Sequence, residues 1–115
     1  NESAGNMIEL VICNNDGMAE GAVASLQQAG YNKDGAHVVP VFGVDATDAA
    51  KALIKEGSMI GTVKQDANGI CQTVKAISEG KTPVDALASL TDERFTVAGD
   101  CASKLYVSYA PYTGE

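Results

Sequence analysis

Three strand–helix units follow one another between residues 7 and 81, and this succession constrains the fold more than any other feature. Each unit begins with a short apolar run and continues into a helix-like segment that ends at Gly30, Gly57 or Gly80. Strands that alternate with helices are typical of α/β folds with a parallel sheet and right-handed crossovers. The pattern therefore predicts an α/β, Rossmann-like lobe built on parallel strands.

The predicted strands are residues 7–13, 38–44 and 59–63. Each is a mostly apolar run of the kind that suits a buried parallel strand. Pro40 has no backbone donor, so we expect it near the start of its strand. Asp16 follows the first strand and is expected to cap the first helix.

Apolar residues recur at helical spacing in each predicted helix, which predicts one inward face per helix. The residues expected to face the core are Ala19, Ala22, Val23 and Leu26, then Ala49, Ala50, Leu53 and Ile54, then Ile70, Val74 and Ile77. Asn68 and Gly69 form a poor helical pair, so the third helix is expected to begin late or irregularly.

The last third of the chain has a different pattern. Thr-Pro-Val-Asp at residues 82–85 is typical of a helix start, and this helix should be brief, ending near Leu90. Residues 94–97 and 104–109 alternate like exposed or half-buried strands, and Pro111 should break the last strand. These segments predict a short helix followed by return strands.

The charge balance excludes some classes of partner. The net charge is −7, and an acidic surface repels phosphate backbones and anionic lipid, which argues against nucleic-acid and membrane-surface binding. No apolar run is long enough to span a membrane, and no signal peptide opens the chain. The partner is therefore expected to be something other than a nucleic acid or a lipid surface.

The reactive side chains do not form a catalytic or metal-binding pattern. Cys13, Cys71 and Cys101 stand far apart; one pair could form a disulfide, although packed small hydrophobes are the commoner arrangement. His37 is the only histidine and is expected to be a solvated residue between a loop and a strand. Phosphate-binding glycine motifs are absent. The sequence thus predicts neither an enzyme nor a cofactor.

Polar side chains follow all three predicted parallel strands. Asn15, Asp45 and Gln65 stand at successive strand ends, where α/β sheets bind their ligands. A carboxylate accepts hydrogen bonds from two neighbouring hydroxyls, and each amide both donates and accepts. The set therefore suits a polyhydroxylated ligand, although Asn and Asp are also common after strands simply as turn and cap residues.

Three stretches carry a resemblance to a known family. Residues 8–22, 39–46 and 61–68 resemble the corresponding stretches of the periplasmic galactose/glucose-binding proteins. The resemblance is continuous over residues 8–80 and indicates the sugar-binding group of type I periplasmic binding proteins, which includes the ribose binders.

The resemblance implies roles for individual residues. Asn15 and Asp45 match positions that bond sugar hydroxyls in that family. Gln65 stands where galactose/glucose binders have Asn and ribose binders have Gln, so either kind of monosaccharide stays open. Glu9 matches a calcium-binding glutamate, but one acid cannot hold an ion that takes six to eight oxygens. Glu9 is therefore expected to be a solvated acid, with no metal bound.

The resemblance also implies a larger protein. Residues 1–115 would be a partial, incomplete C-terminal lobe, with a frayed start at residues 1–6, strand–helix units at 7–81, and a helix with return strands to the other lobe at 82–115. The N-terminal lobe would lie upstream. The segment alone would bind sugar weakly or not at all. It would also either self-associate or associate with the missing part of the protein. The implied function is extracytoplasmic capture of a monosaccharide between two lobes that close on it. The closed protein would then be recognised by an ABC permease, or by a receptor in chemosensing.

One alternative shares this fold. The effector-binding core of a LacI-type repressor has similar strand ends, but it needs a helix-turn-helix headpiece, and this acidic chain has no basic patch. Such repressors also tend to carry a proline before the third strand, and residues 55–62 have none.

The location implied by the resemblance to the periplasmic binding proteins is extracytoplasmic, in the periplasm or as a surface lipoprotein.

Overall fold

The computed structural model describes residues 7–90 and 95–115, without the side chain of Ala102. The frayed start expected at residues 1–6 lies outside this part of the chain, as does Arg94 in one predicted return strand. The described chain forms two compact units.

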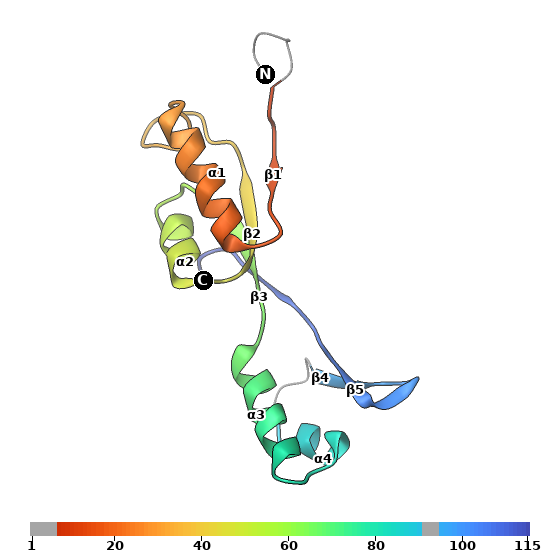
Figure 1. Cartoon of the computed structure of the whole chain (residues 1–115). Helices are drawn as coiled ribbons and strands as arrows, with labels where there is room; N and C mark the ends of the chain where they lie inside the picture. Colours follow the sequence, from red (N-terminus) through yellow and green to blue (C-terminus); the bar gives the residue numbers. More distant parts are fainter. Residues whose placement is uncertain (1–6, 91–94) are drawn as a thin grey trace. The chain divides into compact units, whose positions relative to one another are not determined.

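The first unit comprises Asn1–Lys64 together with Pro111–Glu115, and the second comprises Gln65–Ala110. The first unit contains strands β1, β2 and β3 with helices α1 and α2 (Figure 1). Helices α3 and α4 and a two-stranded antiparallel sheet form the second.

The sheet of the first unit follows the predicted parallel order. Its elements are β1 (Val11–Ile12), α1 (Asp16–Gln28), β2 (Val41–Asp45), α2 (Asp48–Lys55) and β3 (Gly61–Lys64). Strand β1 pairs with β2 and β2 pairs with β3, both in parallel. This confirms the predicted α/β fold class with parallel strands. Pro40 directly precedes β2, as expected for a residue without an N–H.

Strand β6 (Ala110–Tyr112) completes the sheet order β1-β2-β3-β6. The expectation that Pro111 ends the last strand is wrong, because this proline lies inside β6. Its position at the edge of the sheet explains the difference, since an edge strand tolerates the loss of one backbone donor.

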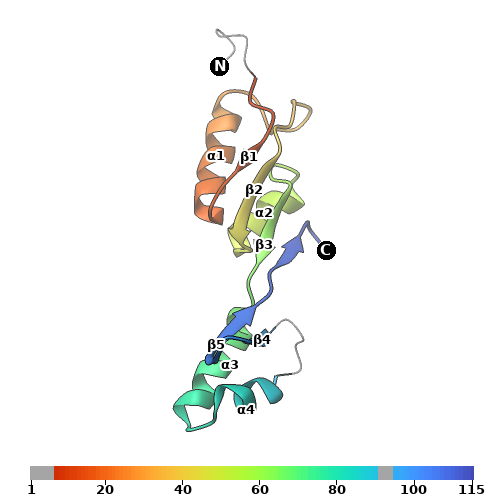
Figure 2. The same cartoon turned by 90° about the vertical axis from the view of Figure 1, so that its right-hand side faces the viewer.

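The core of the first unit lies between its sheet and its two helices. Helices α1 and α2 cover the same side of the strands, as Figures 1 and 2 both show. The fully or nearly buried core residues are Ala19, Val23, Val41, Ala50, Ile54 and Met59, and Val11, Cys13, Ala22, Leu26, Leu53 and Tyr112 pack against them. The inward faces predicted for both helices are confirmed, except that Ala49 is exposed.

The opposite side of the sheet has no covering helix among the described elements of this unit. Side chains alternate along β1, so Val11 packs on the core while Ile12 remains 75% exposed. Leu10 is exposed as well, and only Val11 and Ile12 of the predicted strand 7–13 form strand pairs. The prediction of a buried first strand is therefore wrong for this face.

The second unit contains α3 (Ala67–Ser78), α4 (Pro83–Ala88), β4 (Phe95–Ala98) and β5 (Cys101–Val107). Strands β4 and β5 pair antiparallel and lie beside the two helices (Figure 2). The predicted start of α4 is confirmed, because the Thr82 side chain accepts a hydrogen bond from the Asp85 N–H. Among the described helices, none is long and apolar enough to cross a membrane.

Helix α3 differs from its prediction in two respects. It begins regularly at Ala67, because the Asp66 carboxylate accepts a hydrogen bond from the Gly69 N–H. Its buried residues are Gly69, Thr73 and Ala76, and the expected inward residue Val74 is 61% exposed. The cause is Phe95, whose ring would lie 2.5 Å from a Cβ at position 69, so the small residues face β4.

Two expectations about reactive side chains can be compared with the structure. All three cysteines are free; Cys13 is half-buried, whereas Cys71 and Cys101 are exposed. The packed-hydrophobe interpretation therefore holds for Cys13 and is wrong for the other two. His37 is exposed, as predicted, and meets the Tyr31 ring edge to face.

Candidate functional site

Asn15 connects β1 to α1 and is the N-cap of the helix. Its side-chain Oδ1 accepts a hydrogen bond from the Met18 N–H at 2.9 Å, while its backbone is extended. This corrects the expectation that Asp16 caps α1, because Asp16 is already the first helical residue. Within the described part of the chain, the Asn15 Nδ2 donates to no acceptor, and the side chain is exposed.

Asp45 is the last residue of β2 and lies in strained backbone. Its φ is 114° and that of Ala46 is 54°, two consecutive non-glycine residues in a region that L-residues seldom occupy. Asp45 is exposed, whereas Ala46 is buried. Strain of this kind costs on the order of 1–3 kcal/mol per residue and persists only where surrounding contacts impose it.

The strand register relates Asn15 to Asp45. Ile12 pairs with Phe42 in adjacent parallel strands, and each candidate residue lies three positions beyond its member of this pair. The carboxyl ends of parallel strands meet at one edge of a sheet. The structure therefore brings Asn15 and Asp45 to the same edge of the first unit.

Gln65 directly follows β3, whose last residue Lys64 pairs with Asp45 in register. It is half-buried and is the first residue of the second unit. The structure therefore places two of the three predicted site residues in one unit and the third at the start of the other.

A carboxylate that the sequence analysis assigned only to capping lies beneath this edge. Asp16 is 0% exposed, and its Oδ2 accepts a hydrogen bond from the Thr47 N–H at 2.7 Å. Its Oδ1 accepts a second hydrogen bond from the Thr62 hydroxyl. These partners lie 31 and 46 residues away along the chain, so no local sequence signal could identify them.

The edge offers hydrogen-bonding chemistry. Asn15 contributes an amide donor, and the Asp45 carboxylate contributes up to four acceptor positions. Glu9 is exposed and precedes β1, and a lone acid lacks the six to eight oxygens that calcium takes. In the described residues, no group of three or more His, Cys, Asp and Glu side chains is placed to hold a metal ion.

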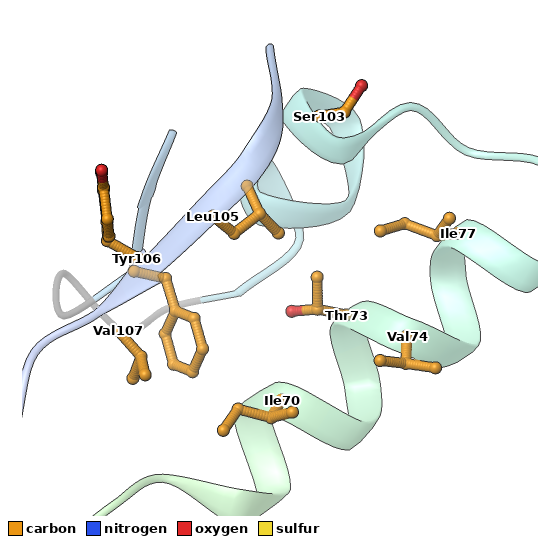
Figure 3. Close-up of a pocket in the computed structure, with 9 residues that line it drawn as sticks. Ile70, Thr73, Val74, Ile77, Ser103, Leu105, Tyr106 and Val107 are labelled. Carbon is orange, nitrogen blue, oxygen red and sulfur yellow. The ribbon is translucent and has the colours of Figure 1, made fainter. Parts of the chain in front are cut away.

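The second unit contains a cavity of about 350 Å³ between α3 and the β4–β5 pair (Figure 3). Figure 3 shows Ile70 and Thr73 of α3 facing Leu105 and Val107 of β5. The lining is largely apolar and includes none of the three predicted site residues. The cavity also explains how Ile70, Val74 and Ile77 remain partly exposed, since they border it.

Comparison with known proteins identifies related sequences. A family model described as a periplasmic binding protein domain matches residues 2–92. The D-galactose/methyl-galactoside binding periplasmic protein MglB of Haemophilus influenzae is 36% identical over 87 residues, which cover 72% of this chain and 24% of MglB. A putative rhizopine-binding protein of Rhizobium meliloti is 39% identical over 89 residues, covering 77% of this chain and 25% of that protein. The chain thus spans about a quarter of the length of these curated relatives.

Proposed function

The chain belongs to the periplasmic binding protein domain family, and on that premise we propose that it contributes to binding a monosaccharide. The observation that carries the proposal is the common sheet edge shared by Asn15 and Asp45. No covalent chemistry is needed, because reversible hydrogen bonds suffice to hold the ligand.

The two side chains complement a pair of sugar hydroxyls. The Asp45 carboxylate would accept hydrogen bonds from neighbouring hydroxyls, and the Asn15 Nδ2 would donate to a hydroxyl or ring oxygen. Hydrogen bonds to a charged group stabilise by about 1.5–3 kcal/mol each, more than neutral ones. Asp45 is therefore proposed as the strongest single contact.

The names of the relatives suggest the ligand class. One relative is named for D-galactose and methyl-galactoside, and the other for rhizopine. We propose a compact, polyhydroxylated ring as the ligand of this chain. Gln65 is proposed as a third contact because of its place after β3, and its amide would suit a galactose/glucose-like or a ribose-like sugar.

We further propose that the chain is the C-terminal part of a longer, two-lobed protein that closes on the sugar. Parallel sheets are normally covered on both faces, and here the face that carries Leu10 and Ile12 is exposed. Other segments of the same lobe would cover this face. The closed protein would then present its sugar to an ABC permease outside the cytoplasm, or to a sensory receptor.

Titration calorimetry on the intact natural polypeptide tests sugar binding. D-Galactose, D-glucose and D-ribose are the probes, and saturable heat is expected with at least one. Asp45→Asn removes the charge and should weaken that binding by about tenfold to a hundredfold. The absence of saturable heat with every probe would contradict the proposal.

Asp48→Asn is the matched control. Asp48 lies three residues further on, in the first turn of α2, with a fully exposed side chain that forms an ion pair with Lys51. The same charge is removed, so any general electrostatic effect is the same. Affinity should stay within about twofold of wild type, because exposed ion pairs contribute little. Equal losses in both variants would show that Asp45 is not a direct contact.

A further inference from the structure

We propose that Asp16 is a positioning residue for the ligand, an inference that rests on the proposed function. Asp16 is 0% exposed, so in this proposal it acts on the ligand through other residues. It joins the start of α1 to the turn that follows β2, and so fixes the two backbone segments that carry Asn15 and Asp45. Sugar affinity should therefore depend on a side chain that the sugar never touches.

The contacts of Asp16 explain how it holds the turn. A buried carboxylate is costly unless hydrogen bonds satisfy it, and its two oxygens accept from the Thr47 N–H at 2.7 Å and the Thr62 hydroxyl. The Thr62 oxygen in turn accepts a weaker hydrogen bond from the Ala46 N–H at 3.4 Å. The two backbone N–H groups that follow Asp45 are thus connected to Asp16. That of Thr47 is bonded directly, and that of Ala46 is bonded through the Thr62 hydroxyl.

The strained backbone needs such an anchor. Asp45 and Ala46 both have positive φ. Glycine, which has no Cβ, adopts positive φ far more readily than either residue. The hydrogen bonds from Ala46 and Thr47 begin directly after the strained pair. Without them, the turn could relax and the Asp45 carboxylate would leave the position that Asn15 complements.

Strand β2 makes room for the anchor. A Cβ at Gly43 would lie 2.3 Å from Asp16 Oδ1, which is closer than real contacts allow. Gly43 pairs with Thr62 in the parallel register, so the glycine and the hydroxyl lie side by side beneath the carboxylate. The pocket for this carboxylate therefore involves α1, β2 and β3 together.

A purely structural role predicts something different from a positioning role. If Asp16 only stabilised the fold, its removal would lower the unfolding temperature and leave the folded protein's affinity unchanged. If it positions Asp45, its removal weakens binding, and the loss becomes smaller once the Asp45 carboxylate is also absent, because only the part that acts through Asn15 remains. A double-mutant cycle measures this coupling directly.

The experiment uses the intact natural polypeptide with whichever of D-galactose, D-glucose or D-ribose binds wild type. Asp16→Asn keeps the volume but replaces one acceptor oxygen with a donor, and affinity should fall by about tenfold. In the Asp45→Asn background, the same change should weaken binding clearly less, by about threefold or below, because the charged contact that Asp16 positions is already absent. Amide hydrogen exchange in the ligand-free protein should be faster at the Thr47 N–H.

A second variant pair covers the case in which Asp16→Asn fails to fold. Thr62→Val removes only the hydroxyl, so it should also weaken binding, whereas Thr62→Ser keeps the hydroxyl and should weaken it much less. Equal affinity in wild type and Thr62→Val would overturn the inference, as would an Asp16→Asn effect that persists in full without Asp45. If wild type binds none of the sugars, the proposed function fails, and unchanged exchange at Thr47 in Asp16→Asn separately overturns the anchoring role.

Discussion

Gly43 illustrates how one missing side chain shapes the sheet edge. A Cβ there would lie 2.3 Å from Asp16 Oδ1 and 2.9 Å from Met59 Cε. Gly43→Ala should therefore lower the free energy of unfolding by about 1–3 kcal/mol through overpacking. Urea denaturation followed by circular dichroism measures this change.

Gly21→Ala is the matched control for that substitution. Gly21 lies in α1, and no atom lies within 4 Å of a Cβ built there. Alanine is the better helix former, so this variant should gain about 0.5–1 kcal/mol. The same chemical change thus has opposite signs at the two positions, and a loss at both would contradict the packing explanation.

Asn32 combines positive φ with a buried hydrogen-bond network. Its φ is 47°, its Nδ2 donates to the Val39 and Ser58 carbonyls, and its Oδ1 accepts from the Val39 N–H. Asn32→Ala should cost about 3 kcal/mol of unfolding free energy, since buried partners lose their bonds. Asn32→Gly loses the same bonds but tolerates the backbone, so it should be less destabilised by about 1 kcal/mol.

The Asn32 comparison uses thermal and urea unfolding of both variants. Equal destabilisation would mean that the left-handed backbone carries no measurable strain at this position. Wild-type stability in Asn32→Gly would instead mean that the buried side-chain bonds contribute nothing.

Single residues also show where sequence reasoning stops. Asn15 and Asp16 are equally good cap formers, so the local sequence cannot decide which one caps α1. The choice is made by Thr47 and Thr62, because their hydrogen bonds draw Asp16 inward and leave the cap to Asn15. The polar strand ends were predictable from position in the chain, whereas the buried anchor beneath them was not.

At the scale of elements, Asn15 has two separable tasks, capping α1 and the proposed sugar contact. Asn15→Ala removes both, so it should lower the unfolding free energy by about 1 kcal/mol and weaken sugar binding. Asn15→Asp keeps an acceptor for the Met18 N–H and should retain stability within about 0.5 kcal/mol. It lacks the Nδ2 donor, so binding should still weaken.

Calorimetry and urea unfolding on both Asn15 variants separate the two tasks. Full sugar affinity in Asn15→Asp would remove the amide from the proposed site. Reduced stability in Asn15→Asp, equal to that of Asn15→Ala, would contradict the capping explanation.

Helix faces were predictable to different degrees. The apolar spacing of α1 gave the correct buried face, because Ala19 and Val23 meet a sheet from the same unit. In α3 the apolar spacing was present but the buried face is formed by smaller residues, since Phe95 packs against Gly69. Apolar periodicity identifies a helix, but the element that packs against the helix determines which of its faces is buried. In α3 that partner includes Phe95, which is distant in sequence and could not be anticipated from the helix alone.

At the scale of the whole molecule, the succession of strand–helix units was enough to predict the parallel sheet. Short β1–β2 and β2–β3 crossovers leave few other arrangements. The exposure of the sheet face around Ile12 was not predictable. The sequence of an apolar strand is the same whether or not the segment that packs on it belongs to the same 115 residues. The sequence pattern identifies the apolar side chains of a strand, and the structure shows which segments pack against them.

Ile12 tests the proposal that further segments of a longer protein cover this face. It is 75% exposed here, so Ile12→Ser in the 115-residue segment should change the unfolding free energy by less than about 0.5 kcal/mol. In the intact natural polypeptide, the same change should cost about 1.5–3 kcal/mol, because the side chain would be buried there. Ala24→Ser, at an exposed position of α1, is the control and should cost little in either. Urea unfolding of both variants in both polypeptides measures the difference; a small cost for Ile12→Ser in the intact polypeptide would mean that this face is left open.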